Sequence, residues 1–308
     1  MLRIQIFCVL LLGWVSVKAQ NTLYEEPKDQ SYRIALELLQ KQKYGAARQA
    51  FDQYITNYPQ SLQSEDARYY RALCALNLFH PDAESLYKDF VDNFDYHPKA
   101  SFAYFELGNF YFKQEEYQKS AEYFELVPLA KLDQSQQLEA RFKLAYGYFA
   151  QQQFDQALEK FNQIKTSSSK YSAAASYYAG YIEYRNQDYD QALVDLERAK
   201  SQQSYGKLVP FLVANVYYKQ GRYDELLEYV EEVLENNPQS SYQDLYLLAG
   251  EAYYFKKDYQ KAAEYYQTYS QKSKRKLPPD TQYKQAFTQY ATGNLEQAQE
   301  QFKTLASR

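Results

Sequence analysis

The chain has 308 residues, a formal net charge of −4 and an aromatic content of 18%, with 36 tyrosines and 18 phenylalanines but only nine glycines. A mildly acidic chain lacks the basic stripe that phosphate backbones require, so we do not expect it to bind nucleic acid. Because it contains only two cysteines, the fold cannot depend on a disulfide framework.

Residues 1–19 have the layout of a secretory signal peptide. Arg3 gives a positive start, the stretch from Ile4 to Val15 is almost entirely apolar, and a run of small residues predicts cleavage after Ala19. The apolar stretch is shorter than the roughly 20 residues that span a bilayer, so no stable membrane insertion is expected after cleavage. An uncleaved, membrane-anchoring helix is the alternative interpretation.

The residues before Cys8 do not resemble a bacterial lipobox, so we do not expect a lipoprotein. Residues 20–27 are expected to form a short disordered lead. Together, the leader and the absence of cysteine pairs predict an exported, periplasmic protein of a bacterial cell envelope.

From residue 28 onward, a small or apolar anchor residue recurs every 34 to 37 positions. An aromatic or branched apolar residue precedes it by three positions, with His80 in that place once, and another follows it by four. The anchors are Ala47, Ala83, Ser120, Ala157, Ala192, Leu226, Ala262 and Ala298. In seven cases a second small residue lies 12 positions upstream: Ala35, Gly108, Ala145, Gly180, Ala214, Gly250 and Ala286. This period indicates stacked helical hairpins with small residues where paired helices approach closest.

Turn residues agree with the hairpins. Gly221 and Gly293 fall between paired helices, whereas Pro59, Pro128 and Pro238 fall between hairpins. No strand pattern competes with the helical periodicity. The repeats are predicted over residues 28–62, 63–99, 101–133, 138–171, 173–206, 207–240, 243–276 and 279–308.

The repeated motif is clearest in the third repeat, where Leu107, Gly108 and Tyr111 are followed by Tyr117, Ala121 and Phe124. It resembles the tetratricopeptide repeat, and the resemblance covers roughly residues 28 to 308. The resemblance implies an all-α, right-handed superhelical solenoid of about eight helix-turn-helix repeats. It also implies a non-catalytic scaffold or adaptor that binds a peptide or a partner protein.

Two repeats depart from the pattern. The second has Ala72 only 11 residues before its anchor, ahead of a turn at His80 and Pro81, and the sixth has Leu226 at the anchor. Irregular packing is expected at both places.

No catalytic, metal or cofactor site is predicted. Cys74 lies in an apolar helical run and is expected to be a buried small hydrophobe, with a reactive thiol as the alternative. His80 and His97 each precede a proline and are expected in turns, which is a weak case for metal ligands. Acidic pairs such as Glu115 and Glu116 lie beside lysine and glutamine on faces expected to be solvated.

On each first helix, the positions three before, one after and four after the small residue share one face. The resemblance implies that this face lines a concave groove. The predicted partner-binding residues are Phe105, Asn109, Phe112, Phe142, Tyr146, Phe149, Tyr177, Tyr181, Tyr184, Phe211, Asn215, Tyr218 and Tyr254.

Three interpretations of this aromatic face stay open. The rings could fill space between adjacent first helices, bind a protein ligand with apolar or proline-rich anchors, or stack on a glycan or cell-wall strand. Asn109 and Asn215 resemble family asparagines that hold a ligand backbone. The family's carboxylate clamp is absent, because aromatic residues stand where it carries lysine or arginine.

Two further stretches could contact partners. The basic run from Lys272 to Lys276 could dock an acidic lipid or protein, or be a solvated connector. The last helix runs through Phe302 and Leu305 without a polar cap, so this end is expected to meet a second copy, a partner or a continuation of the chain.

Overall fold

The computed structural model describes residues 27–200, 203–236, 242–273 and 277–307. The predicted signal peptide, the lead up to Glu26 and the basic residues 274–276 lie outside these ranges. Across the described ranges the regular structure is entirely helical. None of the helices there has the length and apolarity to cross a membrane. The predicted all-α fold is therefore confirmed.

The chain divides into two compact units between Phe94 and Asp95. The first unit contains two hairpins, and the second helix of the first hairpin packs against the first helix of the second. Its helices are α1 (Pro27–Gln40), α2 (Tyr44–Asn57), α3 (Leu62–Asn77) and α4 (Ala83–Asn93).

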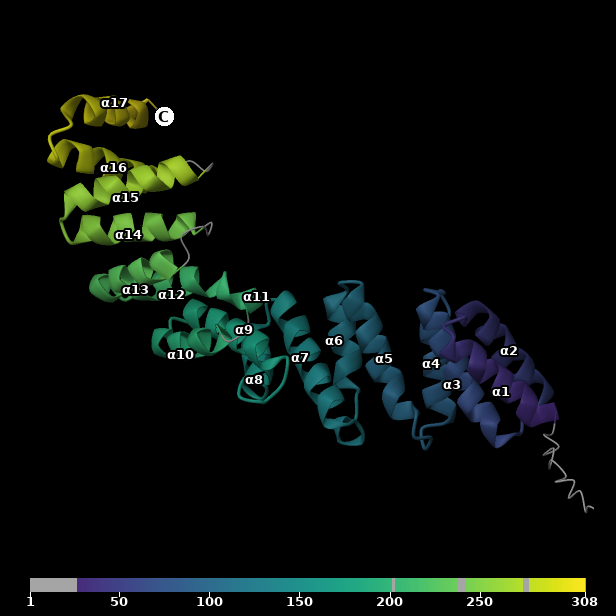
Figure 1. The fold of residues 1–308 in the computed structure, drawn as a ribbon. Coiled ribbons are helices and arrows are strands. Elements are labelled where there is room, and N and C mark those ends of the chain that lie inside the picture. Colours follow the sequence, from purple (N-terminus) through teal and green to yellow (C-terminus); the bar gives the residue numbers. More distant parts are fainter. Residues whose placement is uncertain (1–26, 201–202, 237–241, 274–276, 308) are drawn as a thin grey trace, which may run out of the picture. The chain divides into compact units, whose positions relative to one another are not determined.

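In the second unit, six hairpins stack in chain order (Figure 1). Each second helix packs on the first helix of the following hairpin, so the core is a series of clusters between sequence neighbours. The hairpins are α5 (Ala100–Lys113) with α6 (Tyr117–Glu125), α7 (Gln134–Ala150) with α8 (Phe154–Asn162), α9 (Ser172–Arg185) with α10 (Tyr189–Ala199), α12 (Val209–Lys219) with α13 (Tyr223–Asn236), α14 (Gln243–Phe255) with α15 (Tyr259–Lys272), and α16 (Pro279–Ala291) with α17 (Leu295–Ala306). The short helices η1 (Leu129–Lys131) and α11 (Gln203–Gly206) lie in connectors.

Every hairpin turn has the same backbone conformation. One residue has a positive φ, and the next residue's N–H donates to a carbonyl five residues earlier, as in a Schellman cap. In the fourth hairpin, φ of Gln152 is 60° and the Gln153 N–H donates to the Tyr148 carbonyl at 2.9 Å. The positive-φ residues are Gln42, Phe79, Glu115, Gln152, Gln187, Gly221, Lys257 and Gly293. Because the turn is constant, the spacing between the two small residues is constant.

The glycines of the first helices lie where the paired helices come closest, as the sequence predicted. A Cβ on Gly108 would lie 3.0 Å from the Phe124 ring, and one on Gly250 would lie 2.8 Å from the Tyr266 ring. A side chain at either position would therefore press against the facing ring, so both positions favour glycine. Gly147, which the repeat pattern did not single out, is equally tight between hairpins, since its Cβ would lie 2.8 Å from the Ala121 Cβ.

The two departures have different outcomes. In the second repeat, α4 begins at the anchor Ala83, whereas the other second helices begin three residues before theirs. The turn through His80 and Pro81 therefore shortens the start of this helix, and the irregular packing expected there stays a prediction. Leu226 is fully buried in the same cluster as Ala214, and α13 begins at the usual place, so the larger anchor changes neither turn nor helix start.

Cys74 is fully buried in α3, and burial raises the pKa of its thiol to about 12. The thiol therefore stays protonated and packs as a small apolar group. His80 and His97 lie in turns outside the helices.

Candidate partner-binding face

The predicted partner-binding residues lie on the first helices, at the three positions that we call the first-helix face. One contact recurs between adjacent repeats. It joins the residue four positions after the small residue of one repeat to the residue one position after the small residue of the next repeat. The ring centroids of Phe112 and Tyr146 lie 5.5 Å apart, and those of Phe149 and Tyr181 lie 5.7 Å apart. These rings therefore fill space between adjacent hairpins, which is the structural interpretation given above.

The same contact recurs further along the chain in two forms. The ring centroids of Tyr254 and Phe287 lie 5.9 Å apart, and the Tyr218 hydroxyl donates to Glu251 Oε2 at 3.3 Å. Burial is the main cause that raises the Tyr218 pKa, with Glu251 second. We call this series of contacts the inter-repeat ladder.

The position three before the small residue is covered in three of the repeats. Phe105 is only 6% exposed and packs edge-on against Phe124, with ring centroids 6.0 Å apart. The rings of Phe142 and Tyr171 stack at 5.0 Å, and those of Tyr177 and Tyr205 lie 5.0 Å apart. Phe211, in the sixth repeat, is instead 41% exposed.

The ladder is interrupted between the fifth and sixth repeats. No ring contact or hydrogen bond joins Tyr184 to Asn215 among the described residues; Tyr184 contacts Tyr189 within its own hairpin, at 6.1 Å. The Asn215 amide donates to the Phe211 carbonyl of its own helix at 2.8 Å. We call Tyr184, Phe211 and Asn215 the open segment, because the ladder contact is missing there, although the Tyr184 ring still packs against the core cluster between the fifth and sixth hairpins.

Two lysines that were not predicted from the sequence form hydrogen bonds between adjacent repeats on the first-helix face. Each lies two positions before the small residue of its repeat and donates to the preceding repeat: Lys143 to Asn109 Oδ1, and Lys284 to Glu251 Oε2. The Asn109 carbonyl oxygen therefore already accepts one hydrogen bond within the protein. The sequence did contain a signal for these bonds. In both cases a lysine lies two positions before the small residue, and the preceding repeat has a polar residue one position after its own small residue.

A buried ionic cluster fixes the fifth hairpin to the connector after α8. Lys165 pairs with Asp195, which is fully buried and also pairs with Arg198. The Lys165 Nζ lies 3.6 Å from Glu183 Oε1. Burial is the main cause that raises the pKa of Glu183 to about 7, and Asp195 adds to it. Among the described residues, no group of three or more histidine, cysteine or acidic side chains is arranged to hold a metal.

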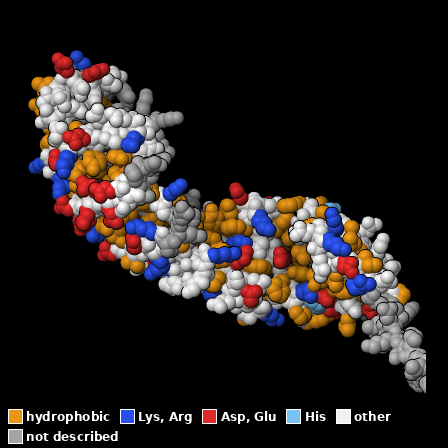
Figure 2. All heavy atoms as spheres, viewed as in Figure 1, with side chains coloured by type: hydrophobic (Ala, Val, Ile, Leu, Met, Phe, Trp, Pro, Cys, Tyr) orange, Lys and Arg blue, Asp and Glu red, His pale blue; other side chains and the backbone are white. Residues whose placement is uncertain are grey.

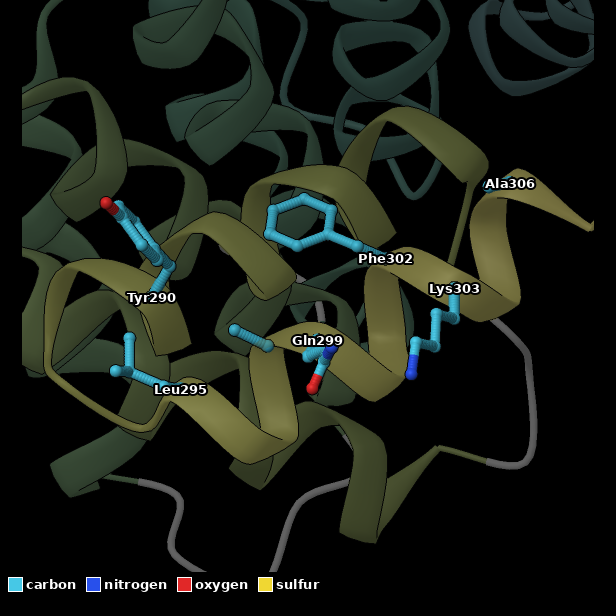
Figure 3. A pocket seen from close by; sticks show the side chains of 7 residues that line it. Tyr290, Leu295, Gln299, Phe302, Lys303 and Ala306 are labelled. Carbon is cyan, nitrogen blue, oxygen red and sulfur yellow. The ribbon is translucent and has the colours of Figure 1, made fainter.

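The last hairpin has an apolar cavity of about 630 Å³ (Figure 3). Tyr290, Leu295 and Phe302 line it together with the aliphatic part of Lys303, and the first two are more than half exposed. Hydrophobic side chains also reach the surface elsewhere along the chain (Figure 2). The end face is thus apolar, and its occupant remains a prediction.

Family comparisons agree with this architecture. A tetratricopeptide repeat model matches residues 32–78, 79–137, 142–205 and 212–274, and a second tetratricopeptide repeat model matches residues 280–308. The chain belongs to the tetratricopeptide repeat family. Tetratricopeptide repeats are typically interaction scaffolds without catalytic activity.

Solved tetratricopeptide repeat structures are similar to this chain at low sequence identity. MamA is 20% identical with a TM-score of 0.46, covering 54% of this chain and 94% of its own. YrrB, described as a TPR protein with an unusual peptide-binding site, is 18% identical with a TM-score of 0.49, covering 61% and 92%. A tetratricopeptide repeat protein from Parabacteroides merdae is 14% identical with a TM-score of 0.46, covering 84% and 99%. No curated protein matches the sequence.

Proposed function

We propose that this tetratricopeptide repeat protein is an envelope scaffold that binds an extended or helical segment of a partner protein over the open segment. The observation that carries the proposal is the interruption of the inter-repeat ladder at Tyr184 and Asn215. Elsewhere the ladder uses the aromatic face to join hairpins. Here the Asn215 amide lies one helical turn after the 41% exposed Phe211 on α12, and Tyr184 holds the preceding ladder position on α9.

The chemistry of the open segment suits a peptide. An exposed phenylalanine offers an apolar anchor, the tyrosine offers a ring with a polar tip, and the asparagine carbonyl can accept a backbone N–H. Aromatic residues of this kind dominate interface energies, with single residues contributing about 2 kcal/mol or more when central.

A photocrosslinking experiment in the native organism tests the proposal. A photoreactive phenylalanine analogue replaces Tyr184 or Phe211, and matched controls replace Glu228 on α13 and Gln156 on α8, which are exposed second-helix positions. We expect the same partner from both open-segment positions, and loss of it when unlabelled partner peptide is added. If a partner protein is captured only from the control positions Glu228 and Gln156, the open segment is not the binding face and the proposal is wrong.

The glycan alternative is tested in the same strains. Crosslinked material that survives protease digestion but not muramidase digestion would favour a cell-wall ligand over a protein. In that outcome the open segment would still be the binding face, but the partner class proposed here would be wrong.

We also propose that the chain is exported and cleaved after Ala19. The charged start, the apolar stretch and the small residues before Gln20 support this proposal. Mass spectrometry of the protein isolated from a periplasmic fraction would check it. A mature protein that retains Met1, or one found in the cytoplasm, would contradict it.

A further inference from the structure

A cavity of about 500 Å³ lies in the first unit, between α3 and α4. Its polar lining comes from Arg68 and Arg71 on α3 and from Asp89 and Asn93 on α4, with apolar walls that include Phe94. Arg68 and Arg71 lie four and one positions before the small residue of their repeat. The cavity is therefore separate from the first-helix face and independent of the function proposed above.

The two guanidinium groups have few partners within the protein. Arg71 Nη1 donates to Asp52 Oδ1 at 3.3 Å, while its Nε is buried and has no hydrogen-bond partner in the described part of the chain. Arg68 makes no hydrogen bond or ion pair with any described residue, and its guanidinium lies 5.9 Å from the centre of the Phe94 ring. Burial, together with the charge of Arg71, lowers the Arg68 pKa.

Arg71 has a counter-ion in Asp52, whereas Arg68 is partly buried and has none among the described residues, and a desolvated charge is normally paired in protein structures. Two guanidinium groups at one cavity would be balanced by an anion that each can meet with two parallel N–H donors. Asp89 is the acidic group in the lining, but it lies outside ion-pair distance of both arginines in the described structure. Since Asp52 pairs with Arg71, the positive charge left without an ion-pair partner at the cavity is that of Arg68.

We propose that this cavity binds a carboxylate group of a peptide ligand. A single negative charge matches the one guanidinium group, that of Arg68, that has no ion-pair partner, whereas a doubly charged phosphate would be repelled by Asp89. The volume is that of a small-ligand site, and the apolar wall can accept the side chain next to the carboxylate. The Asn93 amide donates one N–H to the Asp89 carbonyl at 2.7 Å and has a second N–H to offer.

Ligand-observed NMR titration of the full chain with short peptides tests the proposal. The probes are acetyl-Ala-Leu with a free C-terminus, the same dipeptide as its C-terminal amide, acetyl-Glu-amide and inorganic phosphate. We expect one or both carboxylate probes to bind, and the Ala-Leu amide to bind at least tenfold more weakly. Binding of acetyl-Ala-Leu favours a chain terminus as the source, and binding of acetyl-Glu-amide favours an acidic side chain.

Variants locate the site. Arg68→Gln should weaken carboxylate binding at least tenfold. Arg68→Lys should weaken it less, because lysine keeps the positive charge but lacks the two parallel N–H donors of the guanidinium group. Arg141→Gln is the matched control, since Arg141 is likewise a partly exposed arginine on a first helix, α7, and its guanidinium donates to Gln163 Oε1 at 2.9 Å. Circular dichroism confirms that each variant is folded.

Three results would overturn the proposal. They are equal binding of acid and amide, tighter binding of phosphate than of either carboxylate, and unchanged binding by folded Arg68→Gln.

Discussion

Replacing Gln152 by glycine should stabilise the protein, because Gln152 occupies a turn position that glycine adopts without strain. Its φ is 60°, it is exposed, and its side chain makes no hydrogen bond among the described residues. The neighbouring Gln153 has a φ of −83° and makes no side-chain capping bond. The two glutamines are therefore a matched pair that differs in backbone conformation.

The magnitude follows from two opposing effects. A left-handed conformation costs a residue with a Cβ about 1–2 kcal/mol, and glycine avoids this cost. Glycine loses more conformational freedom on folding, which costs about 0.5–1 kcal/mol. Gln152→Gly should therefore raise the free energy of unfolding by about 0.5–1 kcal/mol. Gln153→Gly should lower it by a few tenths to about 1 kcal/mol, because only the entropic cost applies.

Urea unfolding of the full chain, followed by far-ultraviolet circular dichroism, measures both variants. The m value should stay the same and the midpoints should move in opposite directions. A triple variant with glycine at Glu115, Gln152 and Gln187 should add the three gains, because the turns are distant from one another. If Gln152→Gly destabilises the protein as much as Gln153→Gly does, the turns are not strained and the reasoning fails.

Three further predictions concern packing, pH and binding. Gly147→Ala should lower the free energy of unfolding by about 1–3 kcal/mol, because its Cβ would lie 2.8 Å from that of Ala121; Gly45→Ala, which has no neighbour within 4 Å, should be neutral or stabilising in the same urea assay. Since burial raises the folded-state pKa of Glu183 to about 7 from its ordinary value of 4.5, its contribution to stability falls as pH rises through this range, by about 3 kcal/mol at most. Glu183→Gln should therefore gain stability over the natural protein at pH 8 but not at pH 4, and equal gains at both would contradict the assignment. Phe211→Ala should abolish partner capture while changing the urea midpoint little, because the side chain is 41% exposed.

The hairpins could be predicted from sequence because their determinants are local. The anchors mark the helix contacts, and the fixed distance to the upstream small residue marks a constant turn. The turn conformation itself was visible only at Gly221 and Gly293, since glutamine, glutamate and lysine have no intrinsic preference for a left-handed φ. The Schellman bonds and the packing of the flanking helices impose it on them.

The candidate site was predictable only in part, because helical periodicity gives a face but not what covers it. Phe105 and Phe211 occupy equivalent positions, yet one is 6% and the other 41% exposed. The difference depends on contacts with the neighbouring hairpins, which periodicity alone does not reveal. Lys143 and Arg68 were missed because a cation on an amphipathic helix is indistinguishable in sequence from a solvated one.

In the described part of the chain, the hydrogen bonds that join one hairpin to the next connect residues at most 36 positions apart, as in the pairs Arg48–Asp82, Asn109–Lys143 and Glu251–Lys284. If the protein were pulled at its two ends, its hairpins would therefore unfold one after another and not in a single event. Each step would release roughly 10 nm of chain, since about 36 residues extend by at most about 3.5 Å each. Such a molecule could lengthen between two anchored neighbours and shorten again while most of its hairpins stay folded.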